Sequence, residues 1–147
     1  MQKAIICDLD GTLSLNHGRS FFDATTCDQD HLNEPVAAVI RWALEDGIKV
    51  IYLSGREFVY VEPTERFLKK HNLHGCDLFM RVAGDNRKDS IIKRELYDAY
   101  VVPQNLDILF VLDDRNQMVD MWRALGLTCF QVAPGVFNKK GTKPICL

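Results

Sequence analysis

Two pairs of aspartates stand out, because each pair directly follows a run of apolar residues. Asp8 and Asp10 follow the run 4–7, and Asp113 and Asp114 follow a second run. Carboxylates gathered in a partly dry site repel one another and raise one another's pKa values. A divalent cation removes this repulsion, and Mg²⁺ prefers oxygen ligands. The pattern therefore predicts a Mg²⁺ site with Asp8 and Asp113 as direct ligands. Asp114 would bind directly or through water, and Asp10 through its backbone carbonyl.

The same aspartates could carry out phosphoryl transfer. A carboxylate beside Mg²⁺ can attack phosphorus and form an aspartyl-phosphate, and Asp8 is placed for this. Gly11 permits a sharp turn that would bring Asp10 back over the site. There Asp10 would protonate the leaving oxygen and later deprotonate a water molecule. The plainer alternatives are turn and helix caps, but two acidic pairs at strand ends favour a shared site.

Phosphoryl transfer also needs groups that hold the phosphate oxygens and neutralise their charge. Hydroxyl and backbone amide groups, a lysine and planar guanidinium groups can all do this. The candidates are Ser54, Gly55, Arg56, Lys88 and Arg115. Lys93 competes with Lys88 for the lysine position. Taken alone, the dipeptide at 54–55 could be a plain turn and Lys88 a solvated loop residue.

The elements that must position these residues alternate along the chain. Apolar runs predict strands at 4–7, 48–53, 77–81, 108–112 and 127–132. Apolar residues at helical spacing predict helices that begin near Asn33, Pro63, Asp89 or Ser90, and Asn116, with Asn33 and Asp89 or Ser90 as side-chain caps. Such alternation predicts a parallel sheet with helices on both faces. In such sheets ligands bind at the carboxyl ends of the strands, where the aspartates lie.

Length and composition indicate one domain, residues 1–147. The chain has 147 residues, of which 47% are hydrophobic and 26% charged, with a net charge of −2. No apolar run approaches the roughly 18 residues of a membrane span, and early aspartates argue against a signal peptide. The five cysteines form no C-x-x-C pair, so no zinc site is expected. Cys7 and Cys129 lie in apolar runs as free thiols, which predicts a reducing, intracellular (cytoplasmic) location.

The order of these residues resembles the haloacid dehalogenase (HAD) superfamily of phosphohydrolases. Four short motifs carry the resemblance: Asp8-x-Asp10-Gly11-Thr12, then Ser54, then Lys88, then Asp113-Asp114. The resemblance implies a Rossmann-like three-layer α/β fold with a parallel sheet. The segments between the first three motifs leave no room for a cap domain beside their expected helices and strands. An uncapped site suits a large substrate whose end enters an open cleft.

Longer segments resemble the phosphatase domain of phage-type polynucleotide kinase-phosphatases. They cover residues 16–19, 54–57, 63–64, 87–89, 113–123 and 131–133. This resemblance implies Mg²⁺-dependent removal of a 3′-phosphate from a DNA or RNA end, with Asp8 as nucleophile and Asp10 as acid and base. Arg19 would join the phosphate-binding candidates, and Arg19 and Arg56 point to a polynucleotide end. The kinase motif G-x-x-x-x-G-K-[ST] is absent, so a kinase or ligase would be a separate partner.

Two other functions share this residue pattern. One is a small-molecule HAD phosphatase such as a nucleotidase, and the other is a receiver-like signalling module that stores an aspartyl-phosphate. The recurrence of paired acids and the availability of Asp10 for hydrolysis favour turnover over storage. Charge favours the polynucleotide: the chain has 18 basic and 20 acidic side chains, so basic ones predominate once the four site aspartates are set aside. The choice between DNA and RNA and the oligomeric state stay open.

Overall fold

The computed structural model describes residues 1–135; residues 136–147, to which the sequence assigns no role, lie outside the described part. The centre of the fold is a sheet of five parallel strands in the order β5-β4-β1-β6-β7. The strands are β1 (Lys3–Cys7), β4 (Lys49–Glu57), β5 (Asp77–Arg81), β6 (Asp107–Asp113) and β7 (Cys129–Gln131). Since β1 lies between β4 and β6, the residues that follow these three strands meet at one edge of the sheet.

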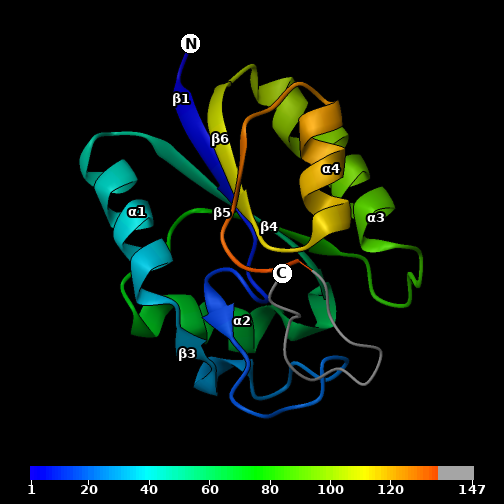
Figure 1. The fold of residues 1–147 in the computed structure, drawn as a ribbon. Coiled ribbons are helices and arrows are strands. Elements are labelled where there is room, and N and C mark those ends of the chain that lie inside the picture. The colour runs from blue at the N-terminus through cyan, green and yellow to red at the C-terminus, as the bar shows by residue number, and fades with distance from the viewer. Residues whose placement is uncertain (136–147) are drawn as a thin grey trace.

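Helices cover both faces of the sheet. The helices α1 (Glu34–Glu45) and α2 (Val61–Lys70) pack on one face, and α3 (Asp89–Leu96) and α4 (Asn116–Ala124) pack on the other. Figure 1 shows α1 on the left of the sheet and α3 and α4 on the right. A π-helical turn (Tyr97–Val101) and a 3-10 turn (Val102–Gln104) continue the chain after α3. No helix within residues 1–135 is both long enough and apolar enough to cross a membrane.

The first strand shows why its sequence is uniformly apolar. Ile5 and Cys7 point into the core beneath α1 and α2, whereas Ala4 and Ile6 point into the core beneath α3 and α4. All four are at most 1% exposed. A strand buried on both faces cannot alternate with polar residues, so a continuous apolar run results. The predicted three-layer α/β architecture is confirmed.

A small ribbon beyond the carboxyl edge of the sheet was not predicted. It pairs β2 (Ser14–Leu15) with β3 (His31–Leu32) in antiparallel fashion. The loop between these strands includes a 3-10 turn, Cys27–Gln29, which packs against α2. Within the described residues, only this loop and ribbon lie between the first motif and α1, and only a 3-10 turn (Phe58–Tyr60), α2 and β5 lie between β4 and Lys88. The expectation of an uncapped site is therefore confirmed.

The predicted helix caps differ from what the structure shows. Asn33 precedes α1, but its Nδ2 donates to the Thr12 backbone oxygen at 2.8 Å instead of capping the helix. Asp89 is the first residue of α3, and its carboxylate accepts hydrogen bonds from Arg81 and Arg115. Neither side chain caps its helix: Asn33 ties the start of α1 to the loop after β1, and Asp89 ties the start of α3 to Arg81 of β5.

Candidate active site

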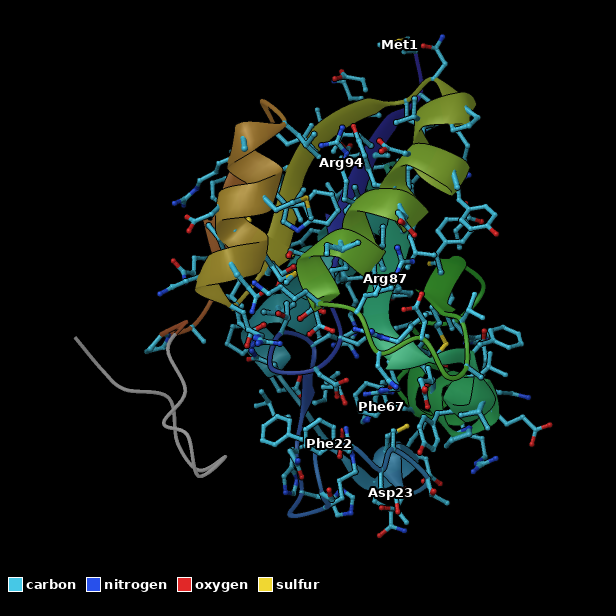
Figure 2. The ribbon with its side chains drawn as sticks, turned by 90° about the vertical axis from the view of Figure 1, so that its right-hand side faces the viewer. Met1, Phe22, Asp23, Phe67, Arg87 and Arg94 are labelled. Carbon is cyan, nitrogen blue, oxygen red and sulfur yellow. The ribbon has the colours of Figure 1, made fainter. Side chains whose placement is uncertain are left out.

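The candidate site lies at the carboxyl edge of the sheet. In Figure 2 the strands run from the end of the molecule marked by Met1 toward the end marked by Phe22 and Asp23. The backbone N–H of Asp8 donates to the Leu112 oxygen at 3.0 Å, so the sheet hydrogen bonding extends one residue past β1. The chain then turns sharply, and Gly11 N–H donates to the Ser14 oxygen at 3.0 Å.

Three aspartates and one lysine form a buried cluster at this edge. Lys93 Nζ on α3 donates to Asp8 Oδ1 at 2.6 Å and to Asp113 Oδ2 at 3.1 Å. Thr12 Oγ1 donates to Asp8 Oδ2 at 2.9 Å and lies 3.3 Å from Asp114 Oδ1. Asp8, Lys93, Asp113 and Asp114 are all between 1% and 6% exposed. The cluster thus draws on the segment just after β1, on α3 and on the carboxyl end of β6.

The electrostatics of this cluster are unbalanced. Burial raises the pKa of Asp8 well above its usual range, and the Asp113 carboxylate raises it further. Burial and Asp113 likewise raise the pKa of Asp114 to about 6. Burial alone would lower the pKa of Lys93, but the carboxylates of Asp113 and Asp8 outweigh it and hold that pKa above its usual value. One ammonium offsets one of three carboxylates, so a divalent cation would neutralise the remainder.

The donor set fits such a cation. Asp8, Asp113 and Asp114 each offer a carboxylate oxygen, and these oxygens lie within 4.8 Å of one another. Gly11 allows the turn after β1 to lie against the Asp114 carboxylate, because a Cβ at this position would overlap Asp114 Oδ2. Its φ of +83° also favours glycine. Carboxylate oxygens are the ligands that hard divalent cations select. The side chain of Asp10 is not part of this group.

Asp10 is held by two arginines instead. Arg56 donates from Nη2 to Asp10 Oδ1 at 2.7 Å and from Nε to Oδ2 at 3.2 Å. Arg19 Nη2 donates to the same Oδ1 at 2.8 Å. Burial would raise the pKa of Asp10, but the guanidinium groups of Arg56 and Arg19 outweigh it and lower that pKa. An ionised carboxylate and two arginines therefore lie next to the acidic cluster.

Each arginine has its own anchor. Arg56 Nη1 donates to Thr64 Oγ1 at 2.8 Å and to Cys27 Sγ at 3.1 Å. Arg19 donates to Asp30, from Nε to Oδ1 at 3.1 Å and from Nη2 to Oδ2 at 2.8 Å. The side chains of Arg19 and Arg56 are 6% and 3% exposed, so they are held in place along most of their length.

The second motif lies within β4, beside Asp10. Ser54 is 1% exposed, and its Oγ accepts a hydrogen bond from the Arg56 backbone N–H at 3.0 Å. At Gly55 an added Cβ would lie 2.8 Å from Asp89 Oδ1. Of the three predicted residues, Arg56 contacts Asp10 directly. Ser54 bonds to the Arg56 backbone, and Gly55 lies against Asp89.

The lysine position needs correction. Lys88, the residue chosen from the sequence, is exposed in the segment just before α3. Lys93, the competitor, lies one helical turn further along and contacts Asp8 and Asp113. The spacing of the buried residues Ile92 and Leu96 around it was an available signal, because it places Lys93 on the buried face of α3.

Two carboxylates hold site arginines although the sequence did not predict them as site residues. Asp30 anchors Arg19, and Asp89 accepts a hydrogen bond from Arg115 Nη1 at 2.6 Å. Asp89 also pairs with Arg81, which donates to the Gly55 oxygen at 2.7 Å. Arg115, expected to bind substrate, is therefore tied through Asp89 to the strand that carries the second motif.

Comparisons with known proteins agree with this geometry. A family model described as the phosphatase domain of polynucleotide kinase PNKP matches residues 2–137. A protein of Autographa californica nuclear polyhedrosis virus, assigned as a bifunctional polynucleotide kinase/RNA ligase, is 32% identical over 140 residues. That match covers 92% of this chain and 19% of the viral protein.

Solved structures match as well. A chain of the Pnkp1/Rnl/Hen1 RNA repair complex is 55% identical with a TM-score of 0.89, over 92% of this chain and 44% of that chain. A tungstate-bound class C acid phosphatase from Bacillus anthracis shares the fold, with 17% identity, a TM-score of 0.62, and coverage of 88% of this chain and 65% of the other. The chain spans less than half of the repair protein and a fifth of the viral one. It belongs to the family of polynucleotide kinase phosphatase domains, within the HAD fold.

Proposed function

We propose that the chain is a Mg²⁺-dependent phosphatase that removes 3′-phosphates from polynucleotide ends through an aspartyl-phosphate. The observation that carries this proposal is that the acidic cluster around Asp8 and a pair of arginines lie next to each other. The acidic cluster with Lys93 suits phosphoryl transfer to Asp8. The arginine pair, Arg19 and Arg56, lies beside it at Asp10. A lone phosphate monoester needs the first group, while the phosphodiester next to a terminal phosphate suits the second.

In the first step, a carboxylate oxygen of Asp8 attacks phosphorus. A bond forms between Asp8 and phosphorus, and the bond from phosphorus to the 3′ oxygen breaks. Asp10 gives a proton to that 3′ oxygen, which leaves as a hydroxyl group. For this step Asp10 must be protonated and released from its arginines, and the anionic backbone of a substrate competes for the same guanidinium groups.

In the second step, Asp10 removes a proton from a water molecule that attacks the aspartyl-phosphate. The bond between phosphorus and Asp8 breaks, inorganic phosphate leaves, and Asp8 is regenerated as a carboxylate. One residue thus serves as acid and then as base, which requires that it stay close to the same phosphorus throughout.

Asp8, Asp113 and Asp114 would hold Mg²⁺, which would neutralise charge on the transferring phosphoryl group. The backbone carbonyl of Asp10 is the fourth candidate ligand. Lys93 keeps one oxygen of Asp8 in a defined orientation and offsets part of the cluster's charge. The hydroxyl of Ser54 and the backbone amides near Gly55 would bind phosphate oxygens.

The relatives suggest the setting in which the reaction takes place. The names of the matching proteins include a kinase, a ligase and an RNA repair complex. A ligase needs a 3′-hydroxyl end, which is the product of the proposed reaction. We therefore propose that the chain acts alongside kinase or ligase activity on shared DNA or RNA ends.

A direct test uses oligonucleotides that carry phosphates at both ends, in DNA and RNA versions, incubated with protein and Mg²⁺. Mass spectrometry would identify which phosphate is lost. We expect loss of the 3′-phosphate alone, no reaction in EDTA and none with Asp8→Asn. Asp46→Asn, at the exposed end of α1, is the matched control and should remain active.

Other outcomes would favour the alternatives. Faster release of phosphate from a mononucleotide than from the oligonucleotide would indicate a small-molecule phosphatase. A phosphoprotein that lasts for minutes without product would indicate a receiver-like module. Activity retained by Asp8→Asn would refute the covalent mechanism.

A further inference from the structure

We propose that Trp122 is a positioning residue of the metal site: its indole N–H holds Asp113 so that this carboxylate offers only one oxygen to a cation, which favours Mg²⁺ over the larger Ca²⁺. The inference rests on the proposed function, because it concerns the ion selectivity of the same acidic cluster. Trp122 lies in the last turn of α4, which packs with α3 on one face of the sheet (Figure 1).

Three donors fill most of the hydrogen-bonding capacity of the Asp113 carboxylate. Oδ2 accepts hydrogen bonds from Trp122 Nε1 at 3.1 Å and from Lys93 Nζ at 3.1 Å. Oδ1 accepts one from the Asp114 backbone N–H at 2.9 Å. A carboxylate oxygen has two lone pairs, so Oδ2 is saturated and Oδ1 keeps one free lone pair. Asp113 can therefore bind a cation through Oδ1 without losing any of these bonds.

The indole ring is held in place, so its N–H acts as a fixed donor. Trp122 is 1% exposed and belongs to the core beneath α3 and α4. The ring of Tyr97 meets it edge to face, with ring centroids 5.6 Å apart and 80° between the ring planes. A close-packed ring cannot swing away from Asp113 without disturbing this core. Lys93, in contrast, divides its ammonium group between Asp113 and Asp8.

A carboxylate that is restricted to one oxygen suits a small cation. Mg²⁺ takes about six ligands at about 2.0–2.1 Å, whereas Ca²⁺ takes about six to eight at about 2.3–2.6 Å and can use both oxygens of a carboxylate. While Trp122 and Lys93 occupy Oδ2, Asp113 cannot supply the second oxygen that Ca²⁺ would accept. Hydrogen bonds to a ligating carboxylate are known to control metal affinity, and their loss costs about 10–100-fold.

The test measures the binding of Mg²⁺ and Ca²⁺ alone, by isothermal titration calorimetry of wild type and Trp122→Phe without substrate. The variant keeps an aromatic ring but leaves Oδ2 of Asp113 with one donor and a free lone pair. We expect the preference for Mg²⁺, expressed as the ratio of the two Kd values, to fall by about tenfold. A ratio that stays the same, because both Kd values change by one factor or neither changes, would overturn the inference. Trp42→Phe is the matched control, because Trp42 is 65% exposed on α1 and should leave the ratio unchanged.

A second measurement follows the N–H group itself in unmodified protein. The chain has two tryptophans, so the ¹⁵N-labelled protein should give two indole signals, and the spectrum of Trp42→Phe assigns them. Addition of Mg²⁺ should shift the Trp122 signal, because the carboxylate that accepts its hydrogen bond binds the ion. The Trp42 signal should stay in place. A Trp122 signal that does not move at saturating Mg²⁺ would overturn the inference.

Should Trp122→Phe fail to fold, as judged by circular dichroism, benzothienylalanine in place of Trp122 carries the test. This tryptophan analogue keeps both fused rings and has sulfur where tryptophan has N–H, so the packing is preserved and the donor is lost. The same fall in the ratio is expected, and an unchanged ratio would overturn the inference. A wild type that prefers Mg²⁺ but releases no phosphate from oligonucleotides overturns the proposed function alone. An active wild type whose ratio is unaffected by loss of the N–H overturns this inference alone.

Discussion

Replacing Lys93 with methionine should reveal how much of the acidic cluster depends on its one internal cation. Lys93 is 3% exposed and lies 2.6 Å from Asp8 Oδ1 and 3.1 Å from Asp113 Oδ2. Methionine preserves most of the side-chain volume, so packing losses should be small. The two carboxylates, 7% and 1% exposed at their side chains, would lose their ammonium partner.

The expected cost follows from the burial of these groups. Removing one partner of a buried ion pair costs about 3–5 kcal/mol in the free energy of unfolding. For a domain of this length each kcal/mol moves Tm by about 2–4 °C, so Tm in EDTA should fall by roughly 6–20 °C. Mg²⁺ should recover part of this loss, because ligand at 100 times its Kd adds about 2.7 kcal/mol. Without the ammonium, the carboxylates should bind Mg²⁺ more tightly than in wild type, so the Mg²⁺-dependent rise in Tm should be larger in Lys93→Met.

Thermal unfolding with and without Mg²⁺ measures these shifts, and phosphate release from the oligonucleotide measures activity. Activity of Lys93→Met should fall on the order of 100-fold, because a group that orients and balances the reacting carboxylate is lost. Lys88→Met is the matched control, exposed and expected to change stability by less than about 0.5 kcal/mol. A large loss of activity in Lys88→Met with an active Lys93→Met would refute this assignment.

Three further predictions concern the same edge of the sheet. In EDTA, Tm should fall as pH rises from about 4 to about 6: the pKa of Asp114 is raised to about 6, so the folded state binds more protons than the unfolded state in this range. The slope should be smaller in Asp114→Asn, and an equal slope would contradict the argument. Gly11→Ala should abolish most activity and weaken stabilisation by Mg²⁺, because the added Cβ would overlap Asp114. Gly47→Ala controls for backbone strain, because Gly47 has a φ of +73° and open space around it. Arg56→Gln should raise KM for the oligonucleotide more than for an aryl phosphate in steady-state assays, and equal effects would argue against a contact to the polynucleotide.

The aspartates could be located from the sequence because two simple patterns coincide. Asp8 and Asp113 follow apolar runs that are apolar for one reason, burial on both faces of a parallel sheet. Parallel strands end at one edge, so residues separated by most of the chain are brought together without any knowledge of side-chain packing. The fold and the acidic cluster therefore depend on local patterns that the sequence displays directly.

The lysine and the arginine anchor depend on information that local patterns lack. Lys88 and Lys93 lie on either side of the start of α3. The spacing of Ile92 and Leu96 places Lys93 on the buried face of the helix, but the packing of that face against the sheet is what brings Lys93 to Asp8. Asp30 is followed by a strand of two residues, too short to show any periodicity. Its burial results from contacts with Ser14 and Arg19 across a loop, and a polar loop residue carries no sequence signal for such contacts.

The hydrogen bond from Asp8 N–H to the Leu112 oxygen bears on how the active site opens when the protein is heated. This bond makes Asp8, the proposed nucleophile, the last residue hydrogen-bonded between β1 and β6. Asp10 lies in the turn that follows. Amide exchange at Asp8 should therefore require opening of the sheet between β1 and β6, while exchange in the turn can follow local fraying. We therefore expect Asp8 to keep its position until β1 and β6 separate, whereas the turn that carries Asp10 can open before global unfolding.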